Sequence, residues 1–169
     1  MFKPEKLEIE DAIIMGGKFK NFSGRATDYN REGDRFINVR IPLEKVEQLS
    51  EEGWNIKQLK PKDEGDDPVY YLTVKIRFKS EGGKKDPAIF KGINADNMHK
   101  IREENVGDLD RDEIERTDVV INPSYYNRNG KEGYSAYLDS LYVIIKGNRF
   151  QAKYNVVDED LEYEEEEEE

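Results

Sequence analysis

The sequence predicts one mainly β domain, a sandwich or small barrel with one or two short helices, followed by an acidic tail. Apolar and polar residues alternate with period two over several stretches, which is the pattern of half-buried strands. Helical spacing of apolar residues is confined to two short stretches. The length of 169 residues suffices for one domain with its own core. Five or more curved strands in so short a chain favour a sandwich or barrel.

Three strands are expected in the N-terminal half. Residues 12–24 are interpreted as one strand that bends at Gly16 and Gly17, because glycines inside a strand mark a bulge or sharp bend. Residues 34–41 and 69–79 alternate more regularly. The expected core-facing side chains are Ile13, Met15, Phe19, Ile37, Val39, Ile41, Tyr70, Leu72, Val74, Ile76 and Phe78.

Helices are expected at two places. Residues 42–53 begin with a proline, carry apolar residues on one face and end at a glycine, as helices commonly do. Residues 95–105 form a weaker candidate, in which Met98 and Ile101 make the apolar side. Trp54, directly after the first helix, is expected in the core.

The C-terminal half is expected to return to strands. Residues 117–126 form an apolar run, and the Asn-Gly pair in 127–133 predicts a turn because it accepts positive φ at low cost. A long strand should follow over residues 134–147. Residues 148–157 are expected to pair with that strand through a tight turn.

The acidity of the chain is concentrated at its end. The formal net charge is −11, from 27 basic and 38 acidic residues, and residues 158–169 contain ten of the acids. A block of like charges repels itself and buries nothing, so the tail should be disordered. We therefore expect an OB-type DNA-binding domain at residues 1–157 and a disordered acidic tail at 158–169. The residues expected to bind protein partners are Asp158, Glu159, Asp160, Glu162, Tyr163 and Glu169.

Composition narrows the chemistry. The chain has no cysteine, which excludes disulfides and thiolate metal sites and fits a reducing cytoplasm. No signal peptide or membrane-spanning stretch is apparent. His99, the only histidine, is interpreted as a surface residue of the second helix, so no multi-histidine zinc site is expected. We predict no enzyme, no cofactor and no metal. The carboxylates from Asp108 to Glu115 suggest a magnesium-dependent nuclease only weakly, because a solvated acidic loop explains them better.

The polar faces of the first three strands carry basic and aromatic residues and no acid. Phosphates need cations, and the unpaired bases of a single strand need flat surfaces on which to stack. Aromatic residues are also ordinary strand residues, and lysines also protect sheet edges, so a purely structural use remains an alternative. The residues predicted to contact phosphates are Lys18, Lys20, Arg25, Arg40, Lys75 and Arg77. Those predicted to stack on bases are Phe22, Phe36, Tyr71, and Tyr125 or Tyr137.

The tail fits this interpretation. A tethered acidic segment is attracted to a basic groove, so we expect it to occupy the groove until nucleic acid displaces it. The released tail is then available to a basic patch on another protein. The alternative function is an acidic interaction adaptor or nucleic-acid mimic, whose body ignores DNA.

Four segments carry a resemblance to a known family. "FSGRATDYNREGDRFINVRIP", "EEGWNIKQLKP", "VYYLTVKIRF" and "AYLDSLYVII" occur in this order and are similar to those of phage-encoded single-stranded DNA-binding proteins. The resemblance implies a five-stranded OB-fold barrel that coats single-stranded DNA in replication, recombination or repair, in the cytoplasm of a bacterial host. It also implies a tail that contacts polymerase or helicase–primase; a homodimer is a candidate assembly. Many relatives end in phenylalanine, whereas this chain ends in Glu169.

Overall fold

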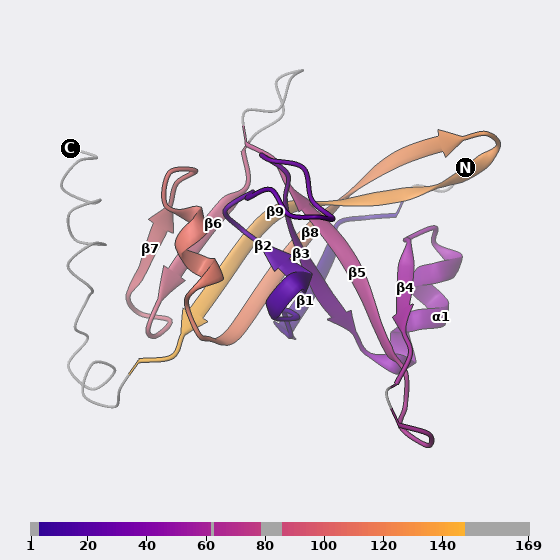
Figure 1. Ribbon diagram of the computed structural model, residues 1–169, viewed down its shortest axis with the longest axis horizontal. Coiled ribbons are helices and arrows are strands. Elements are labelled where there is room, and N and C mark those ends of the chain that lie inside the picture. Colours follow the sequence, from indigo (N-terminus) through magenta and orange to yellow (C-terminus); the bar gives the residue numbers. More distant parts are fainter. Residues whose placement is uncertain (1–3, 62, 79–85, 148–169) are drawn as a thin grey trace.

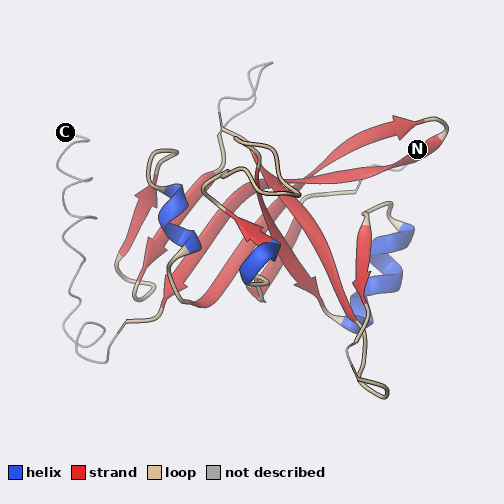
Figure 2. Cartoon of the chain, in the orientation of Figure 1, coloured by secondary structure: helices blue, strands red, loops and turns tan. Residues whose placement is uncertain are grey.

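The computed structural model describes residues 4–61, 63–78 and 86–147, in which one strongly bent sheet dominates (Figures 1 and 2). The fold is mainly β, as the sequence predicted. The strands are β1 (Leu7–Ala12), β2 (Lys20–Asn21), β3 (Arg35–Ile41), β4 (Ile56–Leu59), β5 (Val69–Ile76), β6 (Ala88–Gly92), β7 (Met98–Ile101), β8 (Ile114–Arg128) and β9 (Lys131–Ile145). The helices are α1 (Leu43–Glu51) and two 3₁₀ turns, η1 (Gly17–Phe19) and η2 (Val106–Asp110).

The strands follow the order β1-β8-β9-β5-β3-β2, with β4 added to β5 and the β6–β7 pair added to β9. Within the described residues, no continuous strand pair closes this path into a full barrel. Instead, the chain that continues β1 crosses to β3, where Ile14 bridges Val39 and the Met15 amide donates to the Asn38 carbonyl at 2.9 Å. The result is an OB-like, incompletely closed sheet with one face turned inward and the other exposed.

The inward face forms the core, and the alternation predicted for two strands is confirmed there. Ile37 and Val39 of β3 and Leu72, Val74 and Ile76 of β5 are at most 2% exposed. These residues are neighbours because β3 pairs with β5 along its whole length. Burial of branched side chains on a shared face stabilises each of them by about 1.5–3 kcal/mol relative to exposure.

The predicted first helix is confirmed as α1, and it supports the long β8–β9 hairpin. Gly53 follows α1 with φ of 101°, a conformation that favours glycine. A β-carbon at this position would lie 2.9 Å from Cδ2 of Tyr134 in β9. The Tyr134 amide also donates to the Gly53 carbonyl at 2.8 Å, and Trp54 is 3% exposed. No helix within the described residues is long and apolar enough to span a membrane.

The β8–β9 hairpin projects away from the rest of the sheet (Figure 1). Its turn is the predicted Asn-Gly pair: Asn129 and Gly130 have φ of 53° and 83°, the positive values that suit a two-residue hairpin turn. The strand expected over residues 148–157 and the acidic tail at 158–169 lie outside the described residues.

The prediction of one strand over residues 12–24 was wrong. The stretch divides into the end of β1, the 3₁₀ turn η1 and the short strand β2. A 3₁₀ turn breaks the two-residue period, so the side chains after it change face. As a consequence Phe22 is buried in the core at 0% exposure, whereas Ile13 is 56% exposed.

The predicted helix at residues 95–105 was also wrong, because its centre is strand β7, paired with β6. His99 and Ile101 are its buried residues, at 7% and 3% exposure. His99 is therefore a buried strand residue rather than a surface residue of a helix. The three-residue spacing of Met98 and Ile101 resembles a helical pattern, but the pairing with β6 decides the structure.

Candidate nucleic-acid interface

The outward face of β3 and β5 gathers basic, polar and aromatic side chains into rows. Directly opposed residues of an antiparallel pair lie on the same side of the sheet. The register opposes Phe36 to Lys75 and Arg40 to Tyr71, so four of the residues predicted to bind DNA share this face. Their rows are adjacent, since β3 and β5 pair without interruption.

The same face extends onto β4, β9 and η1. Lys57 of β4 is opposed to Tyr71, and Lys75 is aligned with Tyr137 of β9. The ring of Phe19 in η1 meets the ring of Tyr71 edge-on, with centroids 5.9 Å apart. We call this surface the stacking face; it comprises Lys18, Phe19, Phe36, Arg40, Lys57, Tyr71, Lys75, Arg77 and Tyr137.

A short chain of hydrogen bonds holds the centre of the stacking face in place. The Thr73 hydroxyl donates to Oδ1 of Asn38 at 2.5 Å, and Nζ of Lys57 donates to Oγ1 of Thr73 at 3.1 Å. Asn38, which is 5% exposed, donates through Nδ2 to the Phe19 carbonyl at 2.6 Å. The contact with Asn38 thereby fixes η1 against β3, and Phe19 stays beside Tyr71.

The cations of the stacking face lie close to its rings. The Lys75 ammonium is 5.6 Å and the Arg77 guanidinium 5.1 Å from the Tyr137 ring centroid, and the Lys18 ammonium is 5.5 Å from that of Phe19. Within residues 4–61, 63–78 and 86–147, no carboxylate forms an ion pair with these three cations or with Arg40. Their positive charge is therefore available to an anion from solution.

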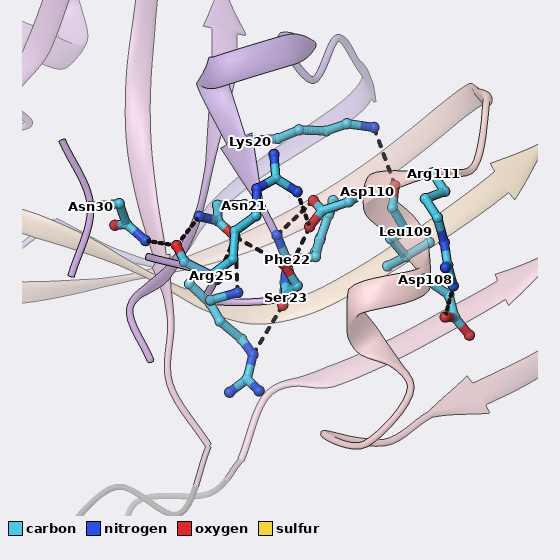
Figure 3. A network of polar contacts seen from close by, with 12 residues as sticks. Lys20, Asn21, Phe22, Ser23, Arg25, Asn30, Asp108, Leu109, Asp110 and Arg111 are labelled. Atoms are coloured by element: carbon cyan, nitrogen blue, oxygen red, sulfur yellow. Dashed lines mark hydrogen bonds and ion pairs between the residues drawn. The ribbon is translucent and has the colours of Figure 1, made fainter. Parts of the chain in front are cut away.

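Lys20 and Arg25, two further predicted phosphate contacts, lie away from these rows, where β2 meets η2 (Figure 3). The Lys20 ammonium donates to the Leu109 carbonyl at 3.2 Å. Arg25 is 3.7 Å from the Asp110 carboxylate and keeps 60% of its side chain exposed. The two cations are already engaged within the protein and border the stacking face rather than form it.

Two predicted stacking residues are placed differently from the others. Phe22 has no exposed surface on which a base can stack, so its assignment is corrected to the core. Tyr125 opposes Tyr134 on the side of the hairpin that leads to the core, and it is 50% exposed. Its hydroxyl donates to Glu132 at 2.6 Å, which raises the pKa of Tyr125 above its usual value. The register places Tyr126, not Tyr125, on the side of Tyr137.

Sequence reasoning missed Phe19 and Lys57. Phe19 was assigned to the core because the 3₁₀ turn before β2 leaves no clear signal. Lys57 belongs to a strand of four residues, too short for alternation to be recognised.

The carboxylates that suggested a magnesium site are engaged by other groups. Asp108 contacts Arg111 at 2.6 Å, Asp112 contacts Lys91 at 2.5 Å, and Glu113 contacts Lys146 at 3.4 Å. Asp110 accepts hydrogen bonds from the amides of Phe22 and Ser23. Among the described residues, no group of three acidic or histidine side chains is arranged to hold a metal ion. The acidic stretch is a set of structural contacts, which removes the basis for the nuclease interpretation.

Replacing Asp110 with alanine is expected to lower the free energy of unfolding by about 2 kcal/mol, because two backbone amides lose a charged acceptor. The side chain is 7% exposed and accepts at 2.8 Å from Phe22 and 3.0 Å from Ser23. Urea denaturation measures the change. The matched control is Asp108→Ala, whose carboxylate pairs with an exposed arginine and should contribute less than about 1 kcal/mol. Equal destabilisation by the two variants would contradict this role of Asp110.

Comparison with known proteins gives the family. The family model described as "Putative phage ssDNA-binding domain" matches residues 1–169. No curated protein sequence matches the chain. The single-stranded DNA-binding protein from bacteriophage Enc34 is 9% identical, with a TM-score of 0.50 over 94% of this chain and 89% of that one.

Two further solved structures are less similar. Enc34 protein in complex with single-stranded DNA is 11% identical with a TM-score of 0.46, covering 86% of this chain and 89% of that one. Gp2.5, a single-stranded DNA-binding protein encoded by bacteriophage T7, is 10% identical with a TM-score of 0.45, covering 92% and 96%. The likeness to the Enc34 protein at a TM-score of 0.50 supports the fold, and the family match extends over the whole sequence. The chain belongs to the family of phage single-stranded DNA-binding domains, which are binding proteins and not enzymes.

Proposed function

We propose that this protein coats single-stranded DNA without strong sequence preference, using the stacking face. One observation carries the proposal: exposed aromatic rings and cations without carboxylate partners among the described residues alternate on one continuous surface. The family of the chain supports the same conclusion.

The chemistry of the face suits single strands. Each base that stacks on an aromatic ring contributes about 1–3 kcal/mol, and every base offers a flat surface, so the contact does not depend on sequence. In duplex DNA the bases are already stacked on one another, and the rings gain little. We assign phosphate contacts to Lys18, Arg40, Lys75 and Arg77. Stacking is assigned to Phe19, Phe36, Tyr71 and Tyr137.

The wider role is proposed from the family and the charge distribution. Residues 1–157 act as the DNA-binding unit, and the acidic residues 158–169 compete with DNA for the stacking face and recruit replication proteins such as polymerase or helicase–primase. The protein acts in phage replication, recombination or repair in the bacterial host cytoplasm. Assembly as a homodimer stays a prediction that analytical ultracentrifugation tests.

The test is a titration of labelled single-stranded oligonucleotide with the full chain, followed by fluorescence anisotropy over a salt series. Four phosphate contacts predict a slope of log affinity against log salt of about −3, from about −0.7 per contact on a single strand. A duplex of the same length should bind more weakly. Failure to observe saturable, salt-dependent binding would reject the proposal and favour an adaptor.

Removing residues 158–169 should raise the affinity for single-stranded DNA, most clearly below about 50 mM salt, where charge interactions are least screened. The ten acids of the tail are the competitors in this view. The same titration on the truncated chain measures the effect, with a variant whose tail acids are replaced by their amides as the control for length. An affinity unchanged by both would reject competition by the tail and leave DNA binding intact.

A further inference from the structure

Tyr29 is the most exposed large apolar side chain among the described residues, at 97% exposure. It lies in the loop between β2 and β3, residues 22–34. Exposure of a whole aromatic ring is unfavourable in water and is common at binding sites. The ring makes no aromatic or cation–π contact within residues 4–61, 63–78 and 86–147.

The backbone around Tyr29 is a defined turn. The Thr27 amide donates to the Asn30 carbonyl at 2.9 Å, and the Asn30 amide donates back to the Thr27 carbonyl at 3.3 Å. The Tyr29 amide donates to the hydroxyl of Thr27 at 3.2 Å. Two residues, Asp28 and Tyr29, therefore form the tip of a small hairpin, and the ring points outward.

The stem of the loop is held by side-chain amides. Oδ1 of Asn21, which is 3% exposed, accepts from the amides of Gly24 at 2.9 Å and Arg25 at 3.2 Å. Nδ2 of Asn30 donates to the carbonyls of Arg25 and Asp34, both at 3.0 Å. These contacts join the two sides of the loop, so its shape is set before any ligand arrives.

The loop is also anchored to η2 (Figure 3). The Asp110 carboxylate accepts from the amides of Phe22 and Ser23, and Phe22 is buried beneath the loop. A β-carbon on Gly107 would lie 3.0 Å from Cβ of Ser23, so η2 approaches the loop closely. A ring presented by such a support binds at a lower entropic cost than one on a free loop.

The loop borders the stacking face. It ends at Arg35, which is opposed to Ile76, the residue before Arg77. Arg77 in turn lies over the ring of Tyr137. The guanidinium of Arg35 lies 5.4 Å from the ring centroid of Phe78, and its Nε donates to the Phe22 carbonyl at 2.9 Å. The loop that carries Tyr29 is thus attached at the Arg77 end of the stacking face.

We propose that Tyr29 stacks on an unpaired nucleobase of single-stranded DNA and extends the binding surface beyond the strands. This inference rests on the proposed function and adds a contact outside the stacking face. Charges in the loop are balanced, with Arg25 and Arg31 opposed by acids that include Asp28, and Arg31 pairs with Asp34 at 3.4 Å. The contact is therefore made by the ring rather than by phosphate neutralisation.

The experiment compares the full-length protein with Tyr29→Ala and Tyr29→Phe in anisotropy titrations of oligo(dT) at several salt concentrations. Tyr29→Ala should weaken binding by about five-fold or more, the lower limit for one stacked base. Tyr29→Phe should bind within about two-fold of the unmodified protein, since it keeps the flat ring. The salt slope should stay the same in both. The control Tyr142→Ala removes another exposed tyrosine, whose ring is stacked on Phe90 instead.

Each outcome decides one point. Thermal unfolding of Tyr29→Ala should match the unmodified protein, because the ring has no packing to lose. An affinity of Tyr29→Ala equal to that of the unmodified protein would overturn the inference, leave the proposed function standing and reassign the ring to a protein partner. An equal loss in Tyr29→Phe would overturn stacking in favour of a hydroxyl contact. Absence of DNA binding by the unmodified protein would overturn the proposed function itself and Tyr29's part in it.

Discussion

Replacement of Arg40, Lys75 and Arg77 by alanine in one variant should lower the affinity for single-stranded DNA about 100-fold at 0.1 M salt. Each phosphate contact contributes about −0.7 to the salt slope, and three of them correspond to about two decades of affinity at this salt concentration. The slope should become less negative by about 2. None of the three cations has a carboxylate partner among the described residues, so the folded protein should lose no ion pair there.

The matched control changes the net charge equally at another place. Lys45 of α1, Lys100 of β7 and Lys146 after β9 are exposed and lie outside the stacking face. Their triple alanine variant should keep most of the affinity, with only the small loss that a more negative protein suffers at long range. Equal losses in the two triple variants would show that total charge, not the stacking face, governs binding.

Replacement of both Tyr71 and Tyr137 by alanine should lower the affinity about 30-fold or more, since two stacked bases contribute at least about 2 kcal/mol. The salt slope should not change, because the phosphate contacts remain. This behaviour separates the rings from the cations. The two positions lie on either side of Lys75, which is opposed to Phe36 and aligned with Tyr137.

The phenylalanine variants of the same two tyrosines are the control, because they keep the rings and lose only the hydroxyls. Their affinity should stay within about three-fold of that of the unmodified protein. Circular dichroism and thermal unfolding of the alanine variant establish that the sheet is retained, since Tyr71 also contacts Phe19. If the alanine variant is folded and binds as tightly as the unmodified protein, base stacking on these rings is excluded.

The regular strands were predictable because each has one buried face. In β3 and β5 the buried residues recur at every second position, and their register follows from uninterrupted pairing. The same alternation correctly assigned Phe36, Arg40, Tyr71 and Lys75 to the outward face. A single strand contains enough information for this, because side-chain direction in a strand is a local property.

The failures come from interactions between distant parts of the chain. The 3₁₀ turn before β2 shifts the side-chain phase, so Phe22 enters the core and Phe19 joins the stacking face. His99 is buried because β7 pairs with β6, a contact that periodicity does not reveal. The support of the Tyr29 loop by Asp110 joins segments 87 and 88 residues apart, which no local pattern predicts.

The structure also separates two kinds of basic residue that look alike in the sequence. Lys20 and Arg25 are engaged by Leu109 and Asp110, whereas Lys75 and Arg77 lie over Tyr137 without a carboxylate partner among the described residues. The difference depends on the acidic stretch around η2, which neutralises the edge of the surface but not its centre. Positive charge is thereby concentrated where the rings are exposed.

DNA binding by the stacking face is best tested by photo-crosslinking of the full chain to an oligonucleotide containing 5-bromodeoxyuridine, with the attachment sites identified by mass spectrometry. We expect crosslinks to Phe19, Phe36, Tyr71 and Tyr137 on the stacking face. Crosslinks confined to other exposed aromatic residues, such as Tyr125 and Tyr142, would show that DNA binds elsewhere and would contradict the proposed function of this face.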